Sequence, residues 1–150
     1  MPGKTARLTI KIKRVNPAAK LPKYEHPNDS GADLYAAVDC TLERGEWKAV
    51  STGLCAEVPA GLELQLRPKS GLALQSGITV LNTPGTIDSG YRGEIKVILV
   101  NLGPAPYRVR KGQKIAQLVV APVARGAFKE VTELSASARG RGGFGSTGLA

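Results

Sequence analysis

The sequence contains few of the residues from which metal centres and disulfide scaffolds are built. Its two cysteines, Cys40 and Cys55, are too few for a disulfide framework and do not have the spacing of a zinc site. One histidine, His26, leaves little material for a Ser-His-Asp triad or a multi-histidine metal site. We interpret the cysteines as small buried residues in a reducing compartment, and so expect a cytoplasmic protein.

Long hydrophobic runs are also absent. The longest stretch without charged or strongly polar residues covers residues 118–124, whereas a membrane-spanning helix needs about 20 apolar residues. The basic residues near the N-terminus are not followed by the apolar core of a secretory signal. We therefore expect neither a membrane partner nor a secretion signal.

Glycine and proline are frequent, which favours short strands over long helices. The 150 residues suffice for one domain with its own core, and 18 glycines and 10 prolines interrupt the chain too often for long helices. Many short strands between turns predict an all-β sandwich or barrel, with one short helical turn near residues 70–74. The apolar patterns predict strands at residues 8–13, 62–67, 95–100, 114–123 and 128–134. The strand at 95–100 is apolar on nearly both faces, so it should be central.

Positive charge is in excess, and most of the excess lies at one end. The net charge is +9, and residues 1–24 contain seven lysines and arginines without an acid. This run is either a solvated edge strand, whose lysines prevent edge-to-edge pairing, or a nucleic-acid-binding arm. Since no aromatic residue is interleaved among these charges to stack on a base, we favour the edge strand. We expect no specific nucleic-acid partner.

The last twelve residues, Arg139 to Ala150, differ in kind from the rest. They contain five glycines and two arginines but no acid and no periodic pattern, so they cannot fold alone. They are either a frayed terminus or a flap that closes on an anion, because arginines and glycine N–H groups can surround one. The chain thus divides into a domain, residues 1–138, and a C-terminal arm, residues 139–150.

Two aspartates stand out as candidate site residues. Asp88 begins the β-turn sequence Asp88-Ser-Gly-Tyr91, which should place Asp88 and Tyr91 at its two ends, facing the same space. Asp33 lies in a run of small and apolar residues and is a candidate to face a divalent metal ion or a metal-bound water. The default interpretation of Asp88 is a residue that only caps its own turn, and the alternative for Asp33 is a turn residue before a strand.

Five segments resemble, in order and spacing, the motifs of one family, the homotrimeric deoxyuridine triphosphatases (dUTPases). They are SGADLYAA at 30–37, PKSGLA at 68–73, GITVLNTPGTIDSGYRGE at 77–94, GQKIAQL at 112–118 and RGRGGFGSTG at 139–148. The resemblance implies a jelly-roll-like β-barrel of the β-clip type, a homotrimer with shared active sites, and a flexible glycine-rich C-terminal arm. It also implies that Mg²⁺-bound dUTP is hydrolysed to dUMP and pyrophosphate, which limits uracil in DNA and supplies dUMP for dTMP synthesis.

The same resemblance implies roles for individual residues. Asp88 would be the general base that activates the attacking water, helped by Gln117. Asp33 would hold Mg²⁺ through water. Asn82 would bind uracil, and Tyr91 would pack beneath the deoxyribose, where a 2′-hydroxyl would collide.

The remaining residues implied by the resemblance bind phosphate and base. Phe144 would stack on uracil. The phosphate-binding residues would be Lys69, Ser70, Gly71, Arg139, Gly145, Ser146 and Thr147. Some positions depart from the family pattern: Lys69 stands for an arginine, Gln113-Lys114 for an Asp-Arg pair, and Gln75-Ser76 for a frequent Lys-His pair. We expect these departures to affect the rate or the subunit contacts.

Other interpretations use the same type of scaffold or charge. A dCTP deaminase, or a bifunctional deaminase-diphosphatase, shares the fold but carries a Ser-x-Ala-Arg-type second motif, whereas this chain has PKSG at 68–71. A non-enzymatic nucleotide-binding regulator would not need the set formed by Asp88, Ser70, Gln117 and Phe144. A nucleic-acid-binding barrel would need aromatic residues on a basic face.

Overall fold

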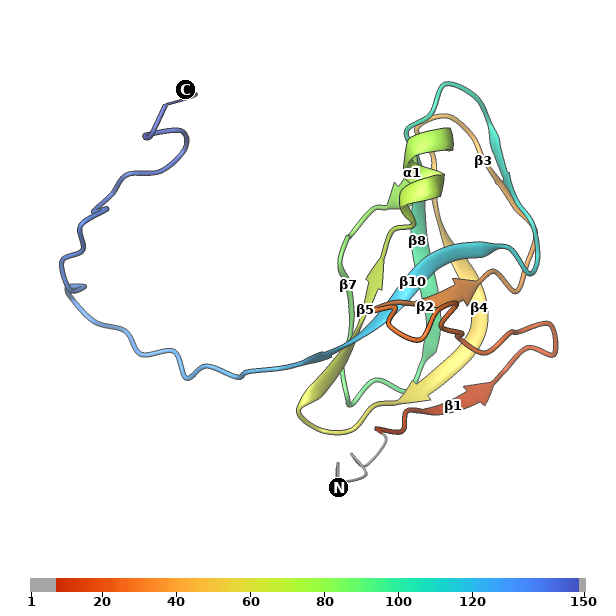
Figure 1. The fold of residues 1–150 in the computed structure, drawn as a ribbon, viewed down its shortest axis with the longest axis horizontal. Coiled ribbons are helices and arrows are strands. Elements are labelled where there is room, and N and C mark those ends of the chain that lie inside the picture. The colour runs from red at the N-terminus through yellow and green to blue at the C-terminus, as the bar shows by residue number, and fades with distance from the viewer. Residues whose placement is uncertain (1–7, 149–150) are drawn as a thin grey trace.

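The computed structural model describes residues 8–148, and within this range ten strands and one helix form the fold (Figure 1). One antiparallel sheet has the order β1 (Lys11–Arg14), β4 (Trp47–Glu57), β8 (Glu94–Asn101) and β6 (Ile78–Val80). The other has the order β2 (Ala32–Tyr35), β10 (Lys114–Pro122), β5 (Leu62–Arg67) and β7 (Gly85–Ile87). A ribbon pairs β3 (Cys40–Leu42) with β9 (Tyr107–Val109), and α1 (Ser70–Ser76) follows β5.

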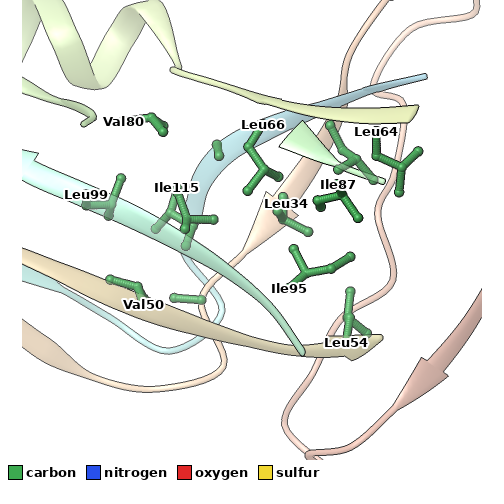
Figure 2. Close-up of a cluster of buried hydrophobic side chains, with 14 of the residues drawn as sticks. Leu34, Val50, Leu54, Leu64, Leu66, Val80, Ile87, Ile95, Leu99 and Ile115 are labelled. Carbon is green, nitrogen blue, oxygen red and sulfur yellow. The ribbon is translucent and has the colours of Figure 1, made fainter. Parts of the chain in front are cut away.

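The two four-stranded sheets face each other across one apolar core. Figure 2 shows Leu34, Leu64 and Leu66 of the second sheet opposite Val50, Leu54 and Leu99 of the first. All six side chains are at most 5% exposed, and full burial of such a side chain stabilises the fold by about 1.5–3 kcal/mol. The predicted all-β, jelly-roll-like architecture is confirmed.

The positions of two strands follow directly from their side chains. Strand β8, apolar on nearly both faces, lies inside its sheet between β4 and β6, as predicted. Strand β1 lies at the edge of the same sheet with mostly exposed side chains, and Lys11 forms an ion pair with Glu57 at 2.9 Å. The prediction of a basic edge strand is therefore confirmed, although β1 begins at Lys11 rather than at residue 8. Lys4 and Arg7 lie outside the described residues.

The predicted helical turn is also confirmed, as α1. The helix ends at Gly77, which has a φ of 65° and donates its N–H to the carbonyl of Ala73 at 3.0 Å. A side chain at Gly77 would place its Cβ 2.6 Å from the backbone nitrogen of Gly103. Glycine is thus required where the chain leaves α1 and enters β6. No helix in residues 8–148 is long and apolar enough to cross a membrane.

The predicted strand at residues 128–134 is wrong. The segment after β10 runs away from both sheets (Figure 1) and is assigned no strand. Phe128 and Leu134 are almost fully exposed, and Val131 is half exposed. Alternating apolar residues give a strand preference, but a strand forms only when its backbone finds a hydrogen-bonding partner.

Gly53, in the irregular middle of β4, provides a test of this packing. Its φ is +67°, and an added Cβ would lie 2.6 Å from Cβ of Asn16 and 2.9 Å from Cβ of Ala19. We expect Gly53→Ala to lower the free energy of unfolding by about 3 kcal/mol or more, because overpacking adds to the left-handed strain.

Gly45→Ala is the matched control, and urea unfolding measures the free energy of unfolding of both variants. Gly45 has a similar φ of +77° but open space around an added Cβ, so only the conformational cost of about 1 kcal/mol remains. Equal losses in the two variants would show that the contacts of Gly53 do not matter.

Candidate active site

Strand β10 brings three of the five family-like segments to one place. Gln117 of β10 lies opposite Asp33 of β2 on one side and opposite Arg67 of β5 on the other. Strand β5 leads through Pro68 to Lys69, the residue before α1. A cavity of about 340 Å³ opens here, and its lining includes Asp33, Lys69 and Gln117.

Asp33 is the electrostatic centre of this cavity. It is only 6% exposed, and its two carboxylate oxygens accept hydrogen bonds from different lysines, Oδ1 from Lys69 and Oδ2 from Lys114, the latter at 2.7 Å. Burial raises the pKa of Asp33, but the hydrogen bonds and charges of Lys114 and Lys69 outweigh it and hold the pKa below its usual value. The carboxylate is therefore ionised and surrounded by positive charge.

Glu25 extends the cluster and was not singled out from the sequence. Its Oε2 accepts a hydrogen bond from Lys114 Nζ at 3.0 Å. The pKa of Glu25 is lowered by this hydrogen bond and by the charge of Lys114, and the pKa of Lys114 is raised by its bonds to Asp33 and Glu25. Lys114, which departs from the family pattern, thus takes part in an ion-pair cluster. Gln113, the neighbouring departure, instead bonds Tyr107 Oη at 2.5 Å and the N–H of Arg110 at 3.0 Å, in the β9–β10 turn.

Gln117 is held over the end of β5. Its Nε2 donates to the carbonyl of Pro68 at 2.9 Å. A Cβ at Gly31 would overlap the Gln117 side chain, so the glycine leaves the space that Gln117 occupies. The role of Gly31 depends on packing between distant segments and has no local sequence signal.

Ser70 and Gly71 begin α1 beside this cavity. Lys69 is extended, with φ −93° and ψ 123°, and no side chain caps the helix. Ser70 and Gly71 are exposed, and an added Cβ at Gly71 would meet no atom within 4 Å. The first N–H groups of a helix have no partner within the helix, so this end can offer donors to an anion.

The third family-like segment forms a different part of the surface. Asn82 and Tyr91 line a cavity of about 370 Å³ with residues of β7 and β8. The predicted turn is confirmed, because Tyr91 N–H donates to the carbonyl of Asp88 at 3.0 Å. In the single chain the two residues line different cavities, since Asp88 lines one of about 550 Å³ with Glu63 and Arg125.

The glycine-rich segment at 139–148 makes local hydrogen bonds. Arg139 Nε donates to the carbonyl of Gly142 at 2.8 Å, and tight turns join Gly143 to Ser146. Phe144 has a left-handed φ of 51° and is fully exposed. Figure 1 shows this part of the chain far from both sheets. A single chain therefore brings Asp33, Lys69, Lys114 and Gln117 together, but leaves the Asn82–Tyr91 cavity and the C-terminal segment apart.

Comparison with known proteins identifies the family of the chain. A family model described as dUTPase matches residues 18–148. The chain belongs to the dUTPase family. The resemblance of the five segments is thereby confirmed.

Individual relatives of this dUTPase-family chain cover nearly all of it. The deoxyuridine 5′-triphosphate nucleotidohydrolase of Clostridium tetani is 53% identical over 140 residues, which is 93% of this chain and 97% of that protein. The enzyme of the same name from Crocosphaera subtropica is 54% identical over 142 residues, or 95% of this chain and all of that protein.

Solved structures show the same fold. The dUTPase of Staphylococcus bacteriophage 80alpha with dUpNHpp superposes with a TM-score of 0.87 at 28% identity, covering 94% of this chain and 99% of that one. A dUTPase from phage phi11 of S. aureus, which coordinates a structural Mg(II) ion, has a TM-score of 0.78 at 23% identity, over 85% of this chain and 99% of that one.

Replacing Asp33 with asparagine tests the ion-pair cluster. Since the pKa of Asp33 is lowered in the folded protein, its charge adds stability that is fully present above the unfolded value of about 3.8 and is lost as the pH falls through the folded value. We expect Asp33→Asn to unfold more easily than the unmodified protein at about pH 7, with the difference shrinking below about pH 4.

Urea unfolding across this pH range measures the difference. Asp39→Asn is the control, because Asp39 is an exposed aspartate whose side chain, within residues 8–148, accepts a hydrogen bond only from the N–H of Lys111. A difference for Asp33→Asn that does not change with pH would contradict the assignment of the stabilisation to its charge.

Proposed function

We propose that this protein hydrolyses dUTP to dUMP and pyrophosphate. The observation that carries the proposal is that a dUTPase-family chain, 53–54% identical to two deoxyuridine 5′-triphosphate nucleotidohydrolases, retains functional side chains in all five segments, with Lys69 in place of the arginine of the second. The reaction limits uracil in DNA and supplies dUMP for dTMP synthesis. The PKSG sequence at 68–71 and Tyr91 favour this activity over dCTP deamination, and Asp88 and Gln117 favour it over a regulator without catalysis.

The reaction requires attack by water on the α-phosphorus. Asp88 takes a proton from this water, which Gln117 helps to orient. As the water oxygen bonds to the α-phosphorus, the bond between the α-phosphorus and the oxygen bridging to the β-phosphate breaks, and pyrophosphate leaves. The hydroxyl of Ser70 and the N–H of Gly71 bind the leaving phosphates, with Lys69 as a counter-charge. Lys69 carries the charge of the family's arginine without its bidentate geometry.

Selectivity comes from the second cavity and the C-terminal segment. Asn82 and the backbone beside it bind uracil, and a site built to satisfy those polar groups rejects bases that leave them unpaired. The ring of Tyr91 lies beneath the deoxyribose. Phe144 stacks on the base, and Arg139, Gly145, Ser146 and Thr147 bind the phosphates.

Asp33 is the residue that would hold Mg²⁺, through water. Residues 8–148 contain no group of three carboxylate, histidine or cysteine side chains that could form a metal cage. Magnesium bound to a triphosphate needs only one or two protein carboxylates, because it keeps several waters, and Asp33 is an ionised carboxylate facing a cavity. When bound, Mg²⁺ would neutralise charge developing on the phosphates.

We propose that the complete site forms between subunits of a homotrimer. The support is geometric: the Asp33 cluster, the Asn82–Tyr91 cavity and the C-terminal arm lie apart on one chain. Phe128 and Leu134, before the arm, expose apolar side chains almost completely, which is unfavourable in water unless another surface covers them. Sedimentation measurements report the mass, and a monomer at working concentration would contradict this assembly.

A nucleotide panel tests the activity itself. The purified protein with Mg²⁺ is given dUTP, UTP, dTTP and dCTP, and the products are separated by chromatography. Conversion of dUTP alone to dUMP and pyrophosphate is the expected result. Deamination of dCTP would assign the protein to the deaminases of the same fold, and no turnover would favour a nucleotide-binding regulator.

The role of Asp88 is tested by Asp88→Asn. The amide keeps the shape of the side chain but cannot take the proton, so we expect dUTP binding to persist while kcat falls by about 10²–10⁴-fold. Calorimetry and steady-state kinetics measure the two effects. Asp39→Asn serves again as the matched control, and turnover close to that of the unmodified protein in Asp88→Asn would remove Asp88 as the base.

The arm is tested by deleting residues 139–150 and by Phe144→Ala. We expect the truncated protein to keep its melting temperature and oligomeric mass but to lose efficient hydrolysis, because residues 139–148 add nothing to the core. Loss of base stacking in Phe144→Ala should weaken binding by about 1–3 kcal/mol, and Phe144→Tyr should restore it. Unfolding of the truncated protein would show instead that the segment is structural.

A further inference from the structure

The ring of Tyr91 is held in place by the chain that follows it. Tyr91 Oη donates a hydrogen bond to the backbone carbonyl of Glu94 at 3.0 Å. The ring lies across Gly93, where an added Cβ would come within 2.6 Å of the ring's Cζ. The position of the ring therefore depends on the path of the backbone at residues 93 and 94.

The side chain of Glu94 fixes that path to the neighbouring strand. Its Oε1 accepts two hydrogen bonds, from the N–H of Gly53 at 2.9 Å and from the hydroxyl of Ser51. Both donors lie in β4 where its register against β8 shifts between Ser51 and Cys55. Such a bulge removes ladder partners, and the Glu94 carboxylate supplies an acceptor instead.

Further contacts fix the start of β8, at Glu94 and Ile95, to the bulge of β4. The Glu94 side chain is only 25% exposed, so its hydrogen bonds are largely shielded from water. The next residue along β8 is tied to the same bulge, because Thr52 Oγ1 donates to the carbonyl of Ile95 at 2.5 Å and Thr52 is fully buried. The bulge of β4 thus fixes the start of β8 by hydrogen bonds, and the backbone carbonyl of Glu94, at that start, accepts the hydrogen bond from Tyr91.

We propose that Glu94 is a positioning residue that sets the discrimination between deoxyribose and ribose. The inference rests on the proposed function, in which Tyr91 excludes the 2′-hydroxyl. Glu94 acts through Tyr91, by keeping the ring close enough to the sugar that a hydroxyl does not fit. A small displacement of the Tyr91 ring would make room for the 2′-hydroxyl of ribose. Discrimination between substrates by packing alone spans about 10–200-fold in kcat/KM.

The experiment compares kcat/KM for dUTP and UTP in Glu94→Ala and Glu94→Gln. The alanine variant loses the acceptor for Ser51 and Gly53, so the dUTP:UTP ratio should fall about tenfold through a gain on UTP. The glutamine variant keeps an oxygen that can accept both bonds and should retain the ratio. Glu57→Ala is the control, because Glu57 is an exposed glutamate on the same strand β4 whose only ion pair is with Lys11 among the described residues.

A second variant, Tyr91→Phe, removes only the hydrogen bond to the Glu94 carbonyl and keeps the ring. It should shift the ratio in the same direction, and it remains informative if Glu94→Ala does not fold in a thermal melt. An unchanged ratio in folded Glu94→Ala, or in Tyr91→Phe, overturns the inference. An unmodified protein that does not hydrolyse dUTP at all would instead contradict the proposed function.

Discussion

The pairing of β10 with both β2 and β5 is the constraint on which the candidate site depends. It places Gln117 opposite Asp33 and opposite Arg67, so segments that lie far apart in the sequence meet at one cavity. Side chains alternate between the two faces of a strand, so a register slip of one residue would turn a strand's side chains to the other face. The apolar core between the sheets fixes that register, and the register in turn fixes the relative positions of Asp33 and Gln117.

Asp33 is a buried carboxylate that is paired with two lysines. An isolated buried carboxylate is strongly unfavourable, and here Lys69 and Lys114 compensate it by direct hydrogen bonds. Such a cluster contributes little stability compared with apolar residues in its place, although removing one partner alone is destabilising. It holds instead a fixed negative group between two positive ones. Glu25 balances the second lysine, so the charge of Lys114 is already partly satisfied before any ligand arrives.

Features that depend on local pattern could be predicted from the sequence, whereas features that depend on distant contacts could not. The central position of β8 and the basic edge strand β1 follow from which faces of each strand are apolar or charged. Gly31 and Glu25 carry no such signal, because their partners, Gln117 and Lys114, lie about 90 residues away. The strand expected at 128–134 failed for a related reason, since an alternating pattern does not show whether a neighbouring strand is present, and the segment pairs with none in residues 8–148.

The length of chain between β10 and the arm has a consequence for how the arm works. Residues 123–138 form the tether, and an extended chain advances roughly 3.3 Å per residue, so the arm's reach of about 50 Å extends beyond its own sheets. A tethered group behaves as a built-in ligand at an effective concentration of about a millimolar. Ordering its glycines costs conformational entropy, so under the proposed function the arm would close only when a nucleotide supplies contacts. Under the proposed function, the binding energy of the substrate would therefore be used in part to order the arm over the site.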